Sequence, residues 1–149
     1  MSLAPSAAEA LRRALATTVV VPVTPYHADG SPDWDTYAAL TARLIGAGIS
    51  VITPNGNTGE FYTLSEAETE TAVESAIRAV GGRAEVLAGV GHDVTTATRA
   101  AAHARAAGAR MIMVHQPVSP WSRPTWPPCS ACPRPPCARR SRPWPARAW

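Results

Sequence analysis

SVITPNGNTGEFYTLSEAE, residues 50–68, is the stretch that decides the fold. Its first four residues are rich in β-branched side chains, which is typical of a buried strand. The glycine-containing segment from Pro54 to Leu64 then predicts a tight polar loop. Ser65 and Glu68 have the spacing of a capping box, in which each side chain bonds the other residue's backbone N–H at the start of a helix.

A strand, a loop and a capped helix in this order place backbone N–H groups beside a helix N-terminus. An anion such as a carboxylate or a phosphate is stabilised there. Loops at the carboxyl ends of parallel strands are also where α/β proteins hold their ligands. On the two glycines alone, Gly56 and Gly59, a plain strand-to-helix turn is the favoured alternative, because short glycine motifs are common.

Further strand and helix units flank this stretch. Strands are predicted at residues 17–23, 50–53, 85–88 and 110–114. Helices are predicted after an N-cap at Asp33 or Asp35, after Ser65, and after Thr95, and Gly81-Gly82 is predicted to end the second of them. The first of these helices carries an apolar stripe of Tyr37, Leu40, Leu44 and Ile45. Repeated βα units of this size predict a parallel sheet of four strands with helices.

The loop GNTGEFYTLSEAE resembles the G-x-T-G-E…L-x-x-x-E signature of the dihydrodipicolinate synthase / N-acetylneuraminate lyase family. Three further segments resemble the same family. They are VTPY at 23–26 with Asp29-Gly30, VLAGVG at 86–91, and Ala107-Gly108-Ala109 before MIMV at 111–114. The resemblance runs over residues 15–118 in the family's order and spacing.

This resemblance implies a (β/α)8 TIM barrel that acts as a lyase on pyruvate or a related 2-oxo acid through a lysine Schiff base, without a cofactor. Complete members are homo-tetramers. A barrel needs about 250 residues, whereas this chain has 149. We therefore expect the N-terminal half of a barrel, divided into a helical segment at 1–16, strands one to four within 17–118, and a tail at 119–149.

The tail differs sharply from the rest in composition. Residues 120–149 hold nine Pro, six Arg, four Trp and three Cys, with no acidic residue, which predicts disorder. Because the resemblance ends where this composition begins, we hypothesise a frameshift that removed the second half of the barrel. Cys129, Cys132 and Cys137 lack a fourth ligand, so no metal site is predicted. The arginines predict no specific nucleic-acid partner.

Charge and cysteine usage point to an ordinary cytoplasmic protein. The formal charge of +3 comes from the tail, because residues 1–119 hold 8 of the 14 basic residues and all 11 acidic ones. Those residues contain no cysteine, and no apolar run has the length of a membrane span. We expect no membrane partner.

The resemblance also implies roles for individual residues. Thr58 would grip the carboxylate of a 2-oxo acid through its hydroxyl and nearby backbone N–H groups. Gly56 and Gly59 would let the backbone approach the ligand. His115 lies in the loop where synthases carry a relay tyrosine, so a substrate contact is conceivable, although a surface or satisfied histidine is the favoured alternative. Glu60 is expected to anchor the loop rather than to react.

Asn57 departs from the synthase and aldolase pattern, which has a second threonine at this position. An amide cannot relay a proton as a hydroxyl does. Together with Phe61-Tyr62, this indicates the branch that includes 5-dehydro-4-deoxyglucarate dehydratase. We retain Asn57 among the substrate-binding candidates, with Thr58, Gly56, Gly59 and His115.

No catalytic residue can be assigned. All 14 basic residues are arginine, and the three tyrosines lie upstream of any fifth strand. A Schiff base needs an amine nucleophile, and arginine stays protonated. The sequence thus predicts a family lyase without its catalytic half. The alternative is a non-catalytic α/β fragment that binds a small anion or a partner. Unpaired edges at the first and fourth strands predict poor solubility or nonspecific oligomers.

Overall fold

The computed structural model describes residues 5–116, and the predictions for the tail lie outside these residues. Four parallel strands alternate with helices, and the sheet order β1-β2-β3-β4 follows the chain. The elements are α1 (Pro5–Leu15), β1 (Val19–Val20), α2 (Trp34–Gly46), β2 (Val51–Ile52), the 3-10 helix η1 (Asn57–Gly59), α3 (Glu66–Val80), β3 (Glu85–Val90), α4 (Val94–Ala107) and β4 (Met111–Val114). The predicted four-stranded α/β arrangement is confirmed.

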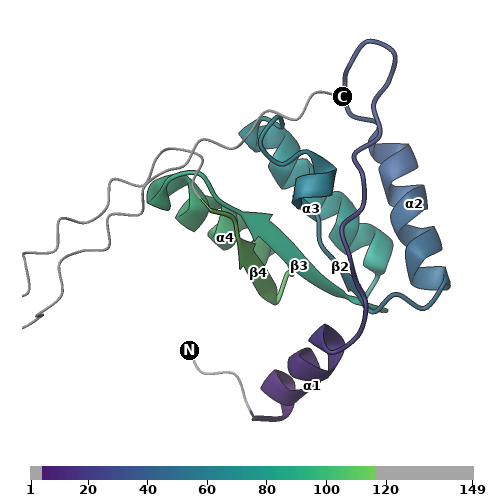
Figure 1. The fold of residues 1–149 in the computed structure, drawn as a ribbon, viewed down its shortest axis with the longest axis vertical. Coiled ribbons are helices and arrows are strands. Elements are labelled where there is room, and N and C mark those ends of the chain that lie inside the picture. The colour runs from purple at the N-terminus through teal and green to yellow at the C-terminus, as the bar shows by residue number, and fades with distance from the viewer. Residues whose placement is uncertain (1–4, 117–149) are drawn as a thin grey trace, which may run out of the picture. The chain divides into compact units, whose positions relative to one another are not determined.

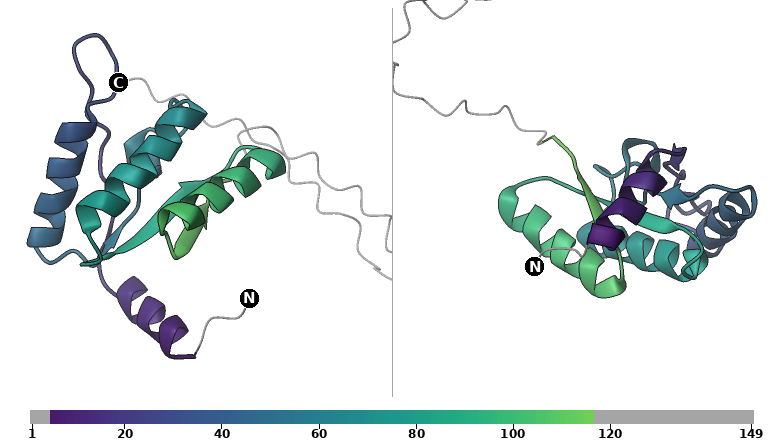
Figure 2. Two further views of the ribbon diagram at one scale, coloured as in Figure 1. Left: turned by 180° about the vertical axis from the view of Figure 1, so that it is seen from behind. Right: turned by 90° about the horizontal axis from the view of Figure 1, so that it is seen from below.

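Helices α2, α3 and α4 lie side by side on one face of the sheet (Figures 1 and 2). The apolar core lies between these helices and the strands. Its buried members are Ile45, Ile52, Val73, Val80, Val86, Ala88, Ala104 and Ala109. The short helix α1 lies at the end of the sheet where β1 begins (Figure 1). Because all four strands are parallel, the loops that follow them gather at one end of the sheet.

Two of the predicted helix starts are confirmed in detail. Asp33 caps α2 by accepting a hydrogen bond from the Thr36 amide at 2.9 Å. Ser65 and Glu68 form the complete capping box at the start of α3. Gly81, in the left-handed conformation, ends α3 as the sequence predicts.

The predicted cap of α4 was wrong. Asp93, not Thr95, caps this helix, because its carboxylate accepts from the amides of both Thr95 and Thr96. A carboxylate satisfies two of the unpaired N–H groups at once, whereas the Thr95 hydroxyl would have satisfied one.

The first strand is also shorter than predicted. Residues 17–23 were expected to form it, but only Val19 and Val20 pair with β2. Pro22 and Pro25 lack the N–H that a ladder requires, so the chain leaves the sheet after Val20. The residues beyond it turn toward the loop that follows β2, where they help to shape the candidate site.

Asp93 makes the stability of α4 depend on pH. Hydrogen bonds from the Thr96 hydroxyl and amide hold the pKa of this carboxyl below its ordinary value. The stabilisation is therefore present above the unfolded-state pKa and is lost as the pH falls through the lower folded-state pKa. Asp93→Asn keeps the cap but cannot ionise. We expect this variant to have the urea midpoint of the wild type at pH 7. Between pH 7 and pH 3 it should lose less stability than the wild type does. If Asp93→Asn loses as much stability as the wild type when the pH falls from 7 to 3, this prediction is wrong. Thr95→Ala serves as the neutral control.

Candidate functional site

The loop after β2 is fastened to the segment that follows β1. The buried Thr24 hydroxyl donates to the carbonyl oxygen of Gly59 at 2.8 Å. The Tyr26 hydroxyl donates to Oε2 of Glu60 at 3.3 Å. Glu60 itself has a left-handed backbone, with φ of 58°, and its carbonyl accepts from the Thr63 hydroxyl. The geometry agrees with the prediction that Glu60 anchors the loop.

Gly56 and Gly59 lie where the loop packs closely on the segment after β1. A Cβ on Gly56 would overlap Cγ1 of Val21 and lie 3.1 Å from its Cγ2. A Cβ on Gly59 would lie 3.1 Å from the carbonyl oxygen of Pro22. Both glycines are buried, and neither is among the residues that line the pocket described below. The loop can therefore lie close to the first strand only because these two positions carry no side chain.

Asn55 joins three parts of the site, and the sequence analysis did not single it out. Its side-chain amide donates to the Thr69 carbonyl in α3 at 2.9 Å. Its backbone carbonyl lies 2.7 Å from Nε2 of His115, beyond β4. Because a carbonyl can only accept, Nε2 of His115 carries the proton. The Pro-Asn-Gly order was the available signal, since asparagine tolerates the left-handed conformation, with φ of 59° here.

Rings from three loops pack together beside Asn55. The buried Phe61 ring stacks on His115, with centroids 4.4 Å apart and planes inclined by 14°. His92, after β3, lies 4.8 Å from the same ring, and Tyr62 meets it edge-on. The Tyr62 hydroxyl donates to the carbonyl of Gln116 at 2.9 Å. The loops after β2, β3 and β4 are thus joined through aromatic contacts.

Backbone strain concentrates at the same end of the sheet. Among residues 5–116, Asn55, Glu60 and His92 are the non-glycine residues with positive φ. All three follow the carboxyl end of β2 or β3. Left-handed conformations of such residues are costly and persist where the surroundings enforce them, which marks this end of the sheet as a candidate functional region.

An open pocket of about 820 Å³ lies at this end of the sheet. It is lined by Val21, Asn57, Thr58, Glu60, Phe61, Tyr62, Thr63, Met113, Val114, His115 and Gln116. Three of the predicted substrate-binding residues, Asn57, Thr58 and His115, therefore share one pocket. Gly56 and Gly59 lie behind it.

Thr58 is exposed, and within residues 5–116 its hydroxyl takes part in no hydrogen bond. Neighbouring threonines behave differently, because Thr63 and Thr69 donate to backbone carbonyls within their own turns. Within residues 5–116 the Thr58 hydroxyl makes no such local hydrogen bond, so it is not used to shape the turn. The amides of Asn57 and Thr58 precede the first hydrogen bond of η1, which joins the Gly59 amide to Gly56.

The charge of the pocket is modest. Of its lining residues, Glu60 carries a permanent charge, and its carboxylate is engaged by Tyr26. His115 can donate only through the nitrogen that Asn55 leaves available, and only when the ring is protonated. A bound carboxylate would thus depend on the Thr58 hydroxyl, the Asn57 amide and backbone N–H groups.

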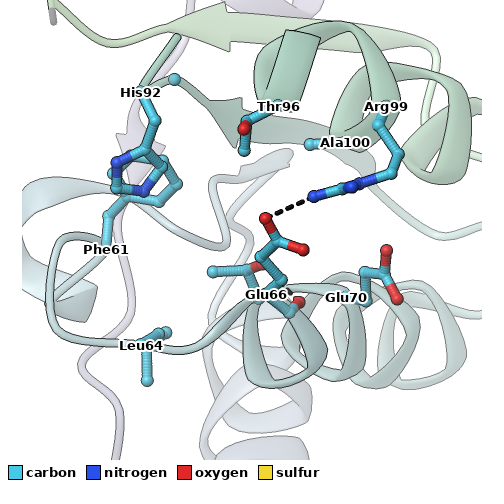
Figure 3. Close-up of a pocket in the computed structure, with 10 residues that line it drawn as sticks. Phe61, Leu64, Glu66, Glu70, His92, Thr96, Arg99 and Ala100 are labelled. Carbon is cyan, nitrogen blue, oxygen red and sulfur yellow. Dashed lines mark hydrogen bonds and ion pairs between the residues drawn. The ribbon is translucent and has the colours of Figure 1, made fainter.

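The start of α3 lines a different and much smaller cavity, of about 40 Å³ (Figure 3). Figure 3 shows Glu66 reaching toward Arg99 of α4, with which it forms an ion pair, while Glu70 lies nearby. Two carboxylates in the first turn, Glu66 and Glu68, already complement the helix dipole. The start of α3 thus already carries two negative charges, which disfavours a further anion beside it.

Residues 5–116 hold neither a grouped set of metal ligands nor a membrane-spanning helix. No three His, Cys, Asp or Glu side chains in this part of the chain are grouped so as to hold a metal ion. Nor is any helix of the described part both long and apolar enough to cross a membrane. The three cysteines lie outside the described residues.

A profile of the dihydrodipicolinate synthetase family matches residues 14–122. The chain belongs to this family. The dihydrodipicolinate synthetase match contains every strand of the sheet and the whole candidate pocket, so the family resemblance expected from the loop motif is confirmed. The relatives in this family are lyases with a barrel fold, and the candidate site lies within the matched part of that fold.

Two enzymes of this family show the range of chemistry among the relatives. The 4-hydroxy-tetrahydrodipicolinate synthase of Gluconobacter oxydans is 39% identical over 104 residues, which are 69% of this chain and 34% of that enzyme. A probable 5-dehydro-4-deoxyglucarate dehydratase of Streptomyces coelicolor is also 39% identical, over 70% of this chain and 33% of the relative. Identity does not separate the synthase branch from the dehydratase branch.

Solved structures give the same result for the fold. Dihydrodipicolinate synthase from Bacillus clausii superposes with a TM-score of 0.72 at 43% identity, over 74% of this chain and 38% of that one. A prophage protein of the same family from E. coli K12, solved in complex with pyruvate, gives a TM-score of 0.65 at 34% identity, over 70% and 36%. The chain thus spans about a third of the length of the relatives it matches.

Proposed function

We propose that this chain is the four-stranded part of a family lyase and that it binds the carboxylate of a small 2-oxo acid such as pyruvate. The observation that carries the proposal is the position of Thr58. Its exposed side chain lines the open pocket, and its hydroxyl has no hydrogen bond within the described residues. A hydroxyl that lines a pocket without a protein partner is available to donate a hydrogen bond to an incoming anion.

The surroundings of Thr58 support the same ligand. Asn57 supplies an amide donor at the pocket wall, and η1 leaves backbone N–H groups at its start. The rigid ring cluster of Phe61 and His115 gives the pocket an apolar side suited to the carbon chain of a small acid. That a family member from E. coli K12 was solved with pyruvate favours a ligand of this class.

We also propose that this chain does not carry out the Schiff-base chemistry. Forming the iminium requires an amine that attacks the 2-oxo carbon, and all 14 basic residues here are arginine. An amide at Asn57, where synthases and aldolases have a threonine, also removes a proton relay. The chain as it stands would therefore bind the acid without turning it over, and we place its parent in the dehydratase-like branch.

Reductive trapping tests this directly. The protein is incubated with pyruvate and borohydride, and its intact mass is measured. We expect no adduct, because a Schiff base must form before it can be reduced. A family synthase that carries its lysine, treated in parallel, should gain the mass of one reduced pyruvate. An adduct on the present chain would overturn the proposal that it is non-catalytic.

The tail fits the proposal of a lost second half. The family match ends at residue 122, and the proline- and arginine-rich composition begins at Pro120. We propose that a frameshift in this stretch separates the chain from strands five to eight. Translation of the downstream DNA in the other two frames should yield those strands with a lysine and a tyrosine, and their absence from both frames would refute the frameshift.

A further inference from the structure

The two outer strands of the sheet have free edges. Within residues 5–116, β1 pairs only with β2, and β4 pairs only with β3. A free edge presents unpaired N–H and C=O groups that can accept another strand. All four strands are parallel and follow the chain order across the sheet. The β1 strand of a second copy, placed parallel beside β4, would therefore continue the sheet in the same pattern.

Apolar side chains are exposed at both edges. Val19 of β1 is 37% exposed, and Ile112 and Val114 of β4 are 48% and 68% exposed. β4 contains no charged residue and no proline, whereas β1 is very short and is followed closely by Pro22. Natural edge strands are usually protected by charged residues, by proline or by being short. The β4 edge lacks such protection and therefore has the character of a strand that is covered in use.

The open pocket gives a second reason to expect a partner here. Val21, just past β1, and Met113 and Val114 of β4 line it from the two edges of the sheet. In a barrel of eight strands, loops and strand ends from the whole ring surround the space at this end. Here four strands and their loops line it from one side, and the other side has no wall among the described residues.

We propose that two copies of this chain associate edge to edge, each placing β4 beside β1 of the other, to close a ring of eight parallel strands. The inference shares the family barrel with the proposed function, but its test is a molar mass and does not depend on whether the chain binds a 2-oxo acid. A two-fold arrangement uses each kind of edge once per copy and leaves none free, so association stops at the dimer. Four strands are half of the eight that close a barrel. An unrelated protein would satisfy both edges only if it also presented two parallel strands.

The molar mass of the full chain in solution is the first test. Size-exclusion chromatography with light scattering over a hundredfold concentration range should give a mass that rises to that of a dimer and then stays constant. A monomer at every concentration would overturn the proposal. So would a mass that keeps growing, because that is open-ended aggregation through the same edges.

A matched pair of variants locates the interface. Val114→Lys puts a charge on the β4 edge and should weaken dimerisation at least tenfold. Val94→Lys changes the same residue type at the start of α4, outside both edge strands, where the side chain is 84% exposed, and should leave the dimer intact. Equal dimerisation by the two variants would rule out the β4 edge.

Hydrogen exchange keeps the proposal testable even if Val114→Lys does not fold. In the wild-type chain, amide protection of β1 and β4 should increase with protein concentration, whereas protection of α3 should not. Protection of β1 and β4 that is independent of concentration, in a chain that light scattering shows to be dimeric, would place the interface elsewhere.

Discussion

Replacing Gly89 with alanine is expected to destabilise the protein by about 3 kcal/mol, which is at the upper end of the usual cost of overpacking. A Cβ at this position in β3 would overlap the carbonyl oxygen of Asn55. It would also lie 2.7 Å from the carbonyl carbon of Asn55 and 2.9 Å from Nε2 of His115. The obstruction is backbone, so no side chain can rotate away to relieve it.

The neighbouring contacts prevent β3 from simply moving. The Gly89 amide donates to the carbonyl of Pro54 at 2.9 Å, which fixes the loop after β2 against the strand. Displacing Asn55 would also break its hydrogen bonds with Thr69 and His115. Small domains have only about 5–15 kcal/mol of stability, so this loss is a large part of the total.

Urea unfolding followed by circular dichroism measures the effect, and Gly46→Ala is the matched control. Gly46 is the last residue of α2, and a Cβ built there meets no atom within 4 Å. Alanine favours a helix over glycine by up to about 1 kcal/mol, so the control should be neutral or slightly stabilising. If Gly89→Ala costs less than about 0.5 kcal/mol, the loop after β2 is not held rigidly against β3 at this position.

The sequence predicted those parts of the fold that depend on local pattern. The capping box at Ser65 and the stop at Gly81 were found because each uses residues a few positions apart. The end of β1 was missed because a β-branched run outweighed Pro22 in the prediction. The cap of α4 was missed because Asp93 and Thr95 both suit an N-cap, and only the geometry decides between them.

The candidate site was predicted only in part, for a physical reason. The motif placed Thr58 and His115 correctly at one end of the sheet, as the pocket shows. The contact between Asn55 and His115 joins residues 60 positions apart, and no periodicity encodes such a contact. The same holds for the close packing of Gly56 on Val21, which joins residues 35 positions apart.

Thr58→Val is expected to weaken pyruvate binding at least tenfold while leaving the fold unchanged. Valine keeps the shape of threonine but removes the hydroxyl. A hydrogen bond to a charged group contributes about 1.5–3 kcal/mol, and 1.4 kcal/mol corresponds to a factor of ten in affinity. Within the described residues the hydroxyl bonds to no other group, so its removal should not shift the urea midpoint.

Saturation-transfer or chemical-shift titration with pyruvate measures the affinity, and two comparisons make the result specific. Thr58→Ser keeps the hydroxyl and should bind within a few-fold of wild type, which a general loosening of the loop would not allow. Methyl pyruvate has lost the anionic carboxylate and should bind the wild-type chain weakly. If the ester and the acid bind equally, or if valine and serine behave alike at position 58, the hydroxyl does not recognise the carboxylate. The pocket would then hold its ligand through the apolar wall formed by Phe61 and His115.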